Sequence, residues 1–350
     1  MTNQLVDEAR IAAWMDERQL EPGAPISVTR ITTGHSNEVF RVERGDLVAV
    51  LRRPPRTPLS PTAHDMAREF RVLTALHNSA GWRAHAPVPV PDPIALCVDV
   101  DVIGAPFYLM HVVDGVVVRE ALPPVLAPDP EAALGCGLAL VDALAGIHRF
   151  DWRAGGLEDF GRPDGYLERQ VPRWLGQLER YKTRPLPEVD EAGEWLAARV
   201  PPPQPSGVIH GDYKLDNVML APGLPVELVA VVDWEQSTIG DPLVDLGWLL
   251  GLWAEANDVS ALAGVTPFTG RTDVPTRREL LDRYADNSDR DLAGVNYYCV
   301  LGLFKLACVM EGSYARFRAG TSDDAYFAAL EKGVPALARR ALEFASGDLL

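Results

Sequence analysis

The chain has 350 residues, carries a net charge of −16 at pH 7, and is 47% hydrophobic and 23% charged. This balance is typical of globular proteins and excludes a disordered or fibrous chain, and the length favours two lobes over a single core. An acidic surface repels phosphate backbones and anionic headgroups, so we expect neither nucleic acid nor a membrane as a partner.

Residues 1–20 predict an amphipathic acidic helix. The segment lacks the cationic start and the apolar core of a leader peptide, and no run in the chain reaches the ~18 apolar residues of a membrane span. The four cysteines lie far apart without a C-x-x-C pair, so we interpret them as small buried hydrophobic residues. These features together predict a cytoplasmic protein, and they indicate nothing about its oligomeric state.

Residues 1–112 predict an N-terminal lobe with an antiparallel five-stranded sheet and one crossing helix. The helix, over 64–77, places apolar residues at helical spacing, and Glu69 stands one position away from that stripe. A solvated helix charge is therefore one interpretation of Glu69. The strands are rich in β-branched residues and separated by turn signals; they are Ile26–Ile31, Glu38–Arg44, Leu47–Arg52, Pro93–Val98 and Pro106–His111.

Residues 113–350 predict a mainly helical lobe, so the fold class is α+β with two lobes. Only two short strands are expected in it, Asn217–Leu220 and Glu227–Val232, joined by a turn at Ala221-Pro222-Gly223. Apolar residues at helical spacing predict the helices, which are Glu131–Arg149, Tyr166–Tyr181, Glu188–Val200, Pro242–Ala256, Arg277–Ala285, Asp291–Phe317 and Asp323–Ala345.

The most polar cluster of the chain has the pattern H-G-D-x-x-x-x-N over His210–Asn217, and Asp233 ends the next apolar segment. As isolated residues, Asp212 and Asn217 could equally be a cap and a turn residue. Phosphoryl transfer, however, needs oxygen ligands for Mg²⁺ and a separate carboxylate that orients an acceptor hydroxyl and takes its proton. We therefore predict that Asn217 and Asp233 hold Mg²⁺ and that Asp212 is the catalytic base.

Further short motifs occur in the same order as in a known family. They are Gly34-His35-Ser36-Asn37, Arg52-Arg53-Pro54-Pro55, Gly240-Asp241-Pro242 and Asp245-Leu246. With these motifs the chain resembles the aminoglycoside phosphotransferase and choline kinase family of the eukaryotic-like kinase superfamily. In particular, it is similar to the kinase-like domains related to those fused to acyl-CoA dehydrogenases.

The resemblance implies a bilobal kinase-like fold that binds ATP and Mg²⁺ between the lobes. It implies that Gly34, Ser36 and Asn37 cover the nucleotide phosphates. Arg52 stands where most kinases have a phosphate-binding lysine, and Glu69 matches the glutamate that pairs with that basic residue. The hinge that receives adenine would be Met110, His111 and Val112.

Three other inferences concern the surroundings of this motif. His210 lacks the additional histidines of a zinc site, so we interpret it as a structural residue that bonds the loop backbone. Asp241 and Asp245 are expected to cap the following helix and to tie the catalytic loop. The acceptor side of the cleft would be formed by helices of the C-terminal lobe, and the candidates are Tyr166, Arg169, Gln170, Trp174, Lys305, Glu311 and Arg316, with Trp174 equally typical of a core.

The leading hypothesis is a Mg-dependent small-molecule kinase that transfers the γ-phosphoryl group of ATP to a hydroxyl of a small metabolite or an aminoglycoside-like acceptor. A nucleotide-binding scaffold without efficient catalysis stays open because Arg52 replaces the usual lysine. A protein kinase and a metal-dependent hydrolase are further alternatives. The acid excess of the C-terminal lobe suits cationic alcohols, whereas the acyl-CoA-dehydrogenase branch implies hydroxy acids or their thioesters.

Overall fold

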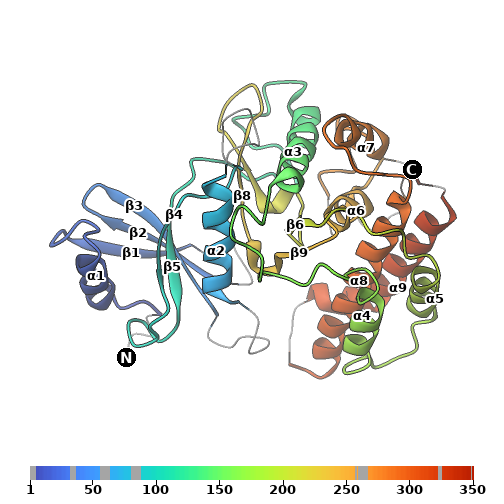
Figure 1. The fold of residues 1–350 in the computed structure, drawn as a ribbon, viewed down its shortest axis with the longest axis horizontal. Coiled ribbons are helices and arrows are strands. Elements are labelled where there is room, and N and C mark those ends of the chain that lie inside the picture. Colours follow the sequence, from blue (N-terminus) through green and yellow to red (C-terminus); the bar gives the residue numbers. More distant parts are fainter. Residues whose placement is uncertain are drawn as a thin grey trace.

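The protein has two lobes, a sheet with two helices at one end and a bundle of helices at the other (Figure 1). This arrangement confirms the predicted α+β class, with an antiparallel five-stranded sheet and a mainly helical second lobe. The computed structural model describes residues 5–31, 37–55, 64–79, 88–256, 258, 267–321, 325–347 and 349–350.

The sheet of the smaller lobe has the strand order β1-β2-β3-β5-β4, and all neighbouring strands are antiparallel. β2 and β3 are joined by the two-residue turn Gly45-Asp46, in which Gly45 has a φ of +55°, the left-handed conformation that tight hairpins require. The strands agree with the predicted ones to within one residue: β1 (Ile26–Ile31), β2 (Glu38–Arg44), β3 (Leu47–Arg53), β4 (Pro93–Cys97) and β5 (Phe107–His111).

The two faces of the sheet meet different helices, α1 (Glu8–Glu17) and α2 (Met66–His77). Leu51 of β3 is buried in the cluster beneath α1, where the rings of Trp14 and Phe107 lie 4.9 Å apart. Side chains alternate along a strand, so the next residue, Arg52, lies on the opposite face, towards α2. The alternation therefore places the side chain of Arg52 outside the apolar cluster beneath α1 and in the space between the lobes.

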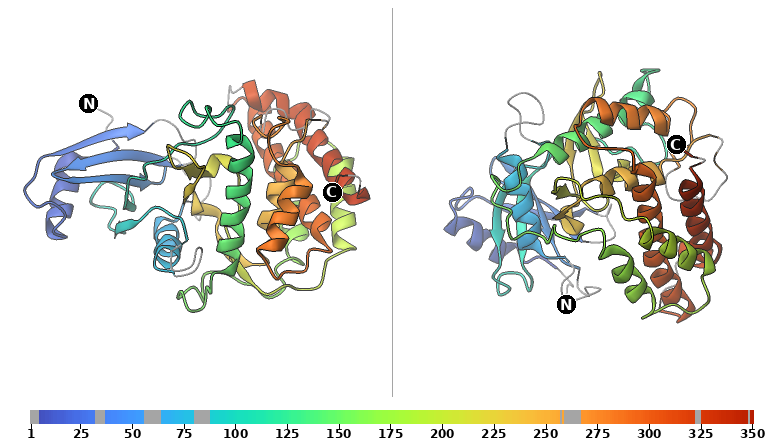
Figure 2. Two further views of the ribbon diagram at one scale, coloured as in Figure 1. Left: turned by 90° about the horizontal axis from the view of Figure 1, so that it is seen from above. Right: turned by 45° about the vertical axis from the view of Figure 1, so that its right-hand side comes forward.

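Helix α2 lies between the sheet and the larger lobe (Figure 2). Its buried side chains belong to one continuous apolar cluster with the interior of the larger lobe. The predicted boundary between residues 112 and 113 falls directly after β5, whereas this apolar interior continues across it. The members of α2 in the cluster are Met66, Val72, Leu73 and Leu76.

The larger lobe contains most of the helices. α3 is long and apolar enough to cross a membrane by length and composition alone, but 67% of that stretch is buried inside the structure, as expected of a core helix. The helices are α3 (Ala132–Arg149), α4 (Gln170–Leu178), α5 (Pro187–Ala197), α6 (Leu243–Leu252), α7 (Arg277–Asp286), α8 (Val295–Arg318) and α9 (Ala325–Ser346).

The prediction of only two strands in this lobe is wrong, because the described residues contain two further strands. β7 (Val218–Leu220) and β8 (Leu228–Val231) form the predicted hairpin, while β6 (Gly207–Ile209) pairs with β9 (Thr238–Gly240). Strands of three residues are too short to show an alternating pattern, and these two are far apart in sequence. Helix α4 also starts later than predicted, since Gly165 has a φ of +62° and turns precede Gln170.

Helices α6 and α8 are in close contact where each carries a glycine. A Cβ atom added to Gly247 of α6 would lie 2.2 Å from the carbonyl carbon of Tyr298 in α8. A Cβ atom on Gly302 of α8 would lie 3.1 Å from the Cα atom of Trp248. The backbones can therefore approach only because both positions lack a side chain.

We expect Gly247→Ala to lower the free energy of unfolding by about 1–3 kcal/mol or more, because the added methyl group overlaps backbone atoms that cannot move without separating the helices. Chemical denaturation measures this change. Gly176→Ala is the matched control: nothing lies within 4 Å of its Cβ position in α4. Alanine there should be neutral or stabilise the protein by up to about 1 kcal/mol, and equal effects of the two substitutions would contradict the close contact.

Candidate active site

The polar motif occupies the turns that connect the short strands of the larger lobe. After β6, the chain turns at Gly211, continues through a single helical turn, η1 (Leu215–Asn217), and enters the β7–β8 hairpin. The hairpin returns to its start, where the amide of Val232 donates to the carbonyl oxygen of Asn217 at 2.9 Å. Asp233 is the next residue, so the hairpin places it beside Asn217.

Asp212 and Asn217 contact each other directly. The side-chain amide of Asn217 donates to the backbone oxygen of Asp212 at 2.8 Å and to its Oδ2 at 3.0 Å. Lys214 Nζ lies 3.1 Å from the same Oδ2. The side chain of Asp212 is 17% exposed and that of Asp233 is 25% exposed. Both carboxylates are thus held in place and still accessible, and the amide oxygen of Asn217 is left to act as a cation ligand.

The loop backbone is held by Asp245 from the first turn of α6. Its carboxylate accepts the amides of His210 at 2.6 Å and Gly211 at 2.9 Å. Burial opposes its ionisation, but His148 at 3.7 Å and the other donors hold the pKa of Asp245 below its usual value. His148 comes from α3, and its sequence context gave no signal for this contact.

His210 bridges two parts of the loop through its two ring nitrogens. Its Nδ1 accepts the amide of Asp212 at 3.2 Å, and its Nε2 lies 2.9 Å from the carbonyl oxygen of Val232, to which it donates. The geometry matches the predicted structural role of His210 on the loop backbone.

Arg52 lies at the centre of a cluster of carboxylates between the lobes. Its Nε is 3.1 Å from Glu69 Oε2, and its Nη2 contacts Asp233 Oδ1 and lies 3.8 Å from Glu235. Burial disfavours its charge, but these carboxylates hold the pKa of Arg52 above its usual value. The structure therefore joins Arg52 to Glu69, as the resemblance implies, and also to the predicted metal ligand Asp233.

Glu69 is buried rather than a solvated helix charge. Its side chain is 1% exposed, and its Oε1 accepts the amide of Trp234 at 3.2 Å. Burial raises the pKa of Glu69 to about 7, with Arg52 opposing this shift and the neighbouring carboxylates adding to it. The residue faces the site because the buried side of α2 is wider than the predicted apolar stripe.

Glu235 links the lobes through residues that precede α2. Asn37 Nδ2 donates to Glu235 Oε2 at 2.8 Å, and His64 Nδ1 lies 3.0 Å from the same oxygen. The structure thus places the Asn37 side chain on a carboxylate, while Gly34 and Ser36 lie outside the described residues. His64 adopts a φ of +64°, and its contribution was missed because no sequence pattern marks it.

The predicted hinge lies at the end of β5. The amide of His111 donates to the carbonyl oxygen of Asp92 at 2.8 Å, so this group is already paired within the smaller lobe. Met110 is partly buried, and Val112 is 38% exposed. The hinge role of Met110, His111 and Val112 remains a prediction, with the His111 amide the least suited of these groups to meet a base.

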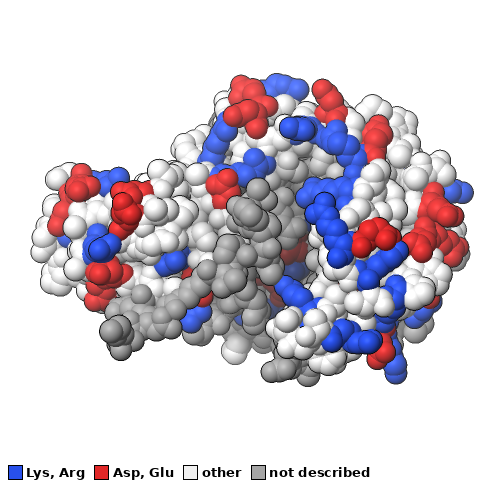
Figure 3. Space-filling model, turned by 90° about the horizontal axis from the view of Figure 1, so that it is seen from below, with Lys and Arg blue, Asp and Glu red and all other residues white. Residues whose placement is uncertain are grey.

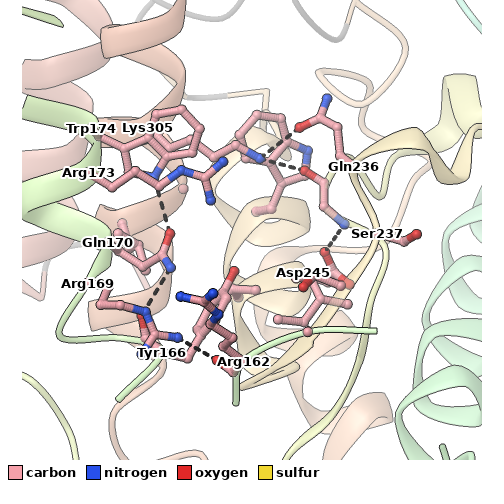
Figure 4. Close-up of a pocket in the computed structure, with 18 of the residues that line it drawn as sticks. Arg162, Tyr166, Arg169, Gln170, Arg173, Trp174, Gln236, Ser237, Asp245 and Lys305 are labelled. Atoms are coloured by element: carbon pink, nitrogen blue, oxygen red, sulfur yellow. Dashed lines mark hydrogen bonds between the residues drawn. The ribbon is translucent and has the colours of Figure 1, made fainter. Parts of the chain in front are cut away.

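A pocket of about 1110 Å³ opens beside Gly211 of the predicted catalytic loop, and we call it the acceptor pocket because residues predicted to bind the acceptor line it (Figure 4). One wall is formed by α4 and the segment that precedes α4. The other walls are the single helical turn η2 (Trp234–Gln236) and the facing sides of α6 and α8. Gly211 of the loop forms part of its wall. Of the predicted acceptor residues, those that line it are Tyr166, Arg169, Gln170, Trp174 and Lys305.

Two predicted acceptor residues do not line this pocket. Glu311 is fully buried and pairs with Arg184, whose Nη2 lies 2.8 Å from its Oε2. Arg316 donates to Ser313 at 3.0 Å, one turn away on the same helix. The prediction for both was wrong because α8 exceeds six turns, and only its first part reaches the pocket.

Basic side chains border the hollow of the larger lobe in Figure 3. Most acids of the acceptor pocket already have partners: Asp159 pairs with Arg71, Glu235 with the cluster around Arg52, and Asp245 with the loop amides. The lining therefore presents positive charge despite the acidic composition of the chain. Its basic members are Arg68, Arg162, Arg169, Arg173 and Lys305.

The fold is that of the kinase-like phosphotransferases. The model of the phosphotransferase enzyme family matches residues 27–281, and the chain belongs to this family. Among curated proteins, it is 35% identical over 328 residues to acyl-CoA dehydrogenase family member 11 of Gallus gallus, with 92% of this chain and 41% of that protein covered. The chain thus spans about two fifths of the length of this relative.

Solved structures support the same conclusion. A protein from Ralstonia eutropha, which bears a provisional name as an aminoglycoside phosphotransferase, superposes with a TM-score of 0.80 at 30% identity and covers 97% of this chain and 98% of its own. A macrolide 2′-phosphotransferase type I superposes with a TM-score of 0.61 at 17% identity, over 93% of this chain and 96% of its own, which shows the fold alone.

Proposed function

We propose that the protein is a kinase that transfers the γ-phosphoryl group of ATP to a hydroxyl group of a small molecule. The observation that supports this most strongly is the contact of Asn217 with Asp212, beside Asp233 and directly after Gly211, which lines the acceptor pocket. The nucleotide would enter between the lobes, near Arg52 and Glu69. The acceptor would enter from the opposite side, between α4 and α8.

In the proposed reaction, Asp212 accepts a hydrogen bond from the acceptor hydroxyl and orients its oxygen towards the γ-phosphorus. A bond forms between these two atoms while the bond from the phosphorus to the β-phosphate oxygen breaks, which releases ADP. The hydroxyl proton passes to Asp212. Asn217 and Lys214 hold its carboxylate in position for this step.

The residues present fit a magnesium ion. Asp233 supplies a carboxylate and Asn217 an amide oxygen, both hard donors, and a few protein ligands suffice because nucleotide phosphates complete the shell. Among the described residues, no group of three His, Cys, Asp or Glu side chains could hold a metal by itself, which disfavours the hydrolase alternative. When bound, Mg²⁺ would neutralise charge on the phosphates, and Asp233 would exchange its contact with Arg52 for the ion.

The acceptor would be a hydroxy acid or its thioester. The basic lining of the acceptor pocket favours an anionic compound and repels cationic aminoglycosides. The similarity to acyl-CoA dehydrogenase family member 11, a protein named for acyl-CoA chemistry, supports the same class. Local charge at the pocket outweighs the overall acidity of the chain, because exposed charges beyond about 8–10 Å are screened.

A second candidate is a nucleotide-binding scaffold with weak catalysis. It is favoured by one observation, the contact of Arg52 with Asp233, which competes with a cation for that carboxylate. ADP release measured with Mg-ATP and a panel of sugars, amino alcohols, aminoglycosides and hydroxyacyl compounds separates the two. We expect stimulation by hydroxyacyl compounds. Nucleotide binding without stimulation by any acceptor would establish the scaffold instead.

A further inference from the structure

Lys305 reaches the base of the acceptor pocket from α8 and ends beside the catalytic loop (Figure 4). Its Nζ donates to the carbonyl oxygen of Gly211 at 2.6 Å and to Gln236 Oε1 at 3.2 Å. The ammonium group lies 4.6 Å from the ring centre of Trp248 and 5.7 Å from that of Trp174. The lysine thus presents its charge one residue away from Asp212.

The charge of Lys305 has no carboxylate partner. Both acceptors of its hydrogen bonds are neutral oxygens, and within the described residues no carboxylate lies at ion-pair distance from Nζ. An ammonium group has three donors, so one remains for a ligand. Burial lowers the pKa of Lys305 to about 8, with the more distant carboxylates of Asp212 and Asp245 opposing the shift. Lys305 is partly buried, and a cation partly withdrawn from water without a counterion is costly to keep.

Of the other four basic residues of the pocket, two bond to the backbone of its wall, and two, Arg162 and Arg173, are exposed. Arg68 donates to the backbone oxygens of Phe160 and Ser237, and Arg169 donates to those of two neighbouring residues, so both serve the structure of the wall. Arg173 lies on the exposed side of the same wall, with its guanidinium 4.8 Å from the ring centre of Trp174. Lys305 is therefore the cation of the lining that lies closest to the catalytic loop.

We propose that Lys305 determines acceptor specificity by binding an oxyanion of the acceptor, a carboxylate or a phosphate. The inference rests on the proposed function and names the side chain that selects among hydroxyl compounds. A carboxylate held on Nζ would place a nearby hydroxyl beside Asp212. A neutral alcohol would leave the partly buried charge uncompensated, and a cationic alcohol would be repelled.

The test compares three acceptors that share one secondary hydroxyl and differ in charge: 3-hydroxybutyrate, 1,3-butanediol and 4-amino-2-butanol. 3-Hydroxybutyryl coenzyme A is a fourth acceptor, whose anionic groups are phosphates. ADP release gives kcat/KM for the wild type, Lys305→Met, Lys305→Arg and Lys332→Met. Lys305→Met keeps the aliphatic stem between the tryptophans, and Lys332 is an exposed lysine of α9 that serves as the matched control.

We expect the wild type and Lys332→Met to prefer at least one anionic acceptor over the diol by about tenfold or more, as a charged hydrogen bond allows. Lys305→Met should lose that preference, so that the ratio of kcat/KM for the anionic acceptor to kcat/KM for the diol falls towards one, and Lys305→Arg should retain much of it. Loss with 3-hydroxybutyrate assigns the carboxylate, and loss with the thioester alone assigns the phosphates. An equal fall for all acceptors, or a preference unchanged in Lys305→Met, would overturn the inference and leave the kinase function standing.

A binding measurement separates this inference from the proposed function. The shift in melting temperature with 3-hydroxybutyrate or the thioester is measured against sodium chloride at equal ionic strength. A melting-temperature shift that disappears in Lys305→Met supports the anion site. If no acceptor stimulates ADP release, that result counts against the kinase function but not against the anion site. Absence of both the shift and the charge preference overturns the site.

Discussion

Asp212→Asn should abolish acceptor-dependent phosphoryl transfer while nucleotide binding stays close to that of the wild type. The substitution keeps the shape of the side chain and its contact with Asn217 but removes the group that takes the hydroxyl proton. Loss of a general base typically lowers the rate by about 10²–10⁴-fold. Acceptor-dependent ADP release measures the rate, and calorimetric titration with Mg-ADP measures the affinity.

The matched control for this experiment is Asp216→Asn, the same change four residues along the loop. Asp216 lines a different, small cavity together with Lys214 and Leu215, away from the acceptor pocket. Its substitution should lower turnover far less than Asp212→Asn does, because its side chain lines another cavity. Turnover that survives Asp212→Asn, or falls equally in both variants, would remove Asp212 from the role of base.

Asp233→Ala should make nucleotide binding independent of magnesium. Carboxylates beside a metal site contribute about 10–100-fold to metal affinity even from outside the coordination shell, and a direct ligand should contribute at least as much. Titration of ADP with and without Mg²⁺ measures this difference for the wild type and the variant. Asp212→Asn provides the comparison, because it should keep the magnesium dependence that Asp233→Ala loses.

An equal loss of nucleotide affinity in Asp212→Asn and Asp233→Ala would contradict this division of roles. A second possible finding concerns Arg52, which contacts Asp233 in the structure. If Asp233→Ala strengthened ADP binding in the absence of Mg²⁺, the freed guanidinium would be the cause. That gain would accompany the loss of magnesium dependence and would not conflict with it.

Local signals made most of the fold predictable. The β2–β3 hairpin has an unambiguous turn at Gly45-Asp46, and the HGDxxxxN pattern directly precedes a hairpin with a clear turn signal at Ala221-Pro222-Gly223. Strands β6 and β9 were not predictable because their stability comes from pairing with each other across the catalytic loop rather than from their own residues. Short segments of this kind acquire their structure from tertiary context.

The candidate site was predictable where one motif carries several side chains. Asp212, Asn217 and Asp233 lie on one loop and one hairpin, so sequence spacing constrains their positions. His64 and His148 approach the site from other elements, and single residues without a pattern give no such constraint. Glu311 was predicted to face the acceptor because it lies on the same helix as Lys305. It lies more than one turn further along, where the helix packs against Arg184.

The contact between α6 and α8 at Gly247 and Gly302 has a consequence for how acceptor range could change among related proteins. At this crossing the backbones of the two helices touch, so their relative position there does not depend on the size of the side chains that face the cavity. Lys305 follows Gly302 by one helical turn, outside the tight crossing. Acceptor specificity can therefore change through substitution of one residue on the cavity side of α8, while the two helices keep their relative position.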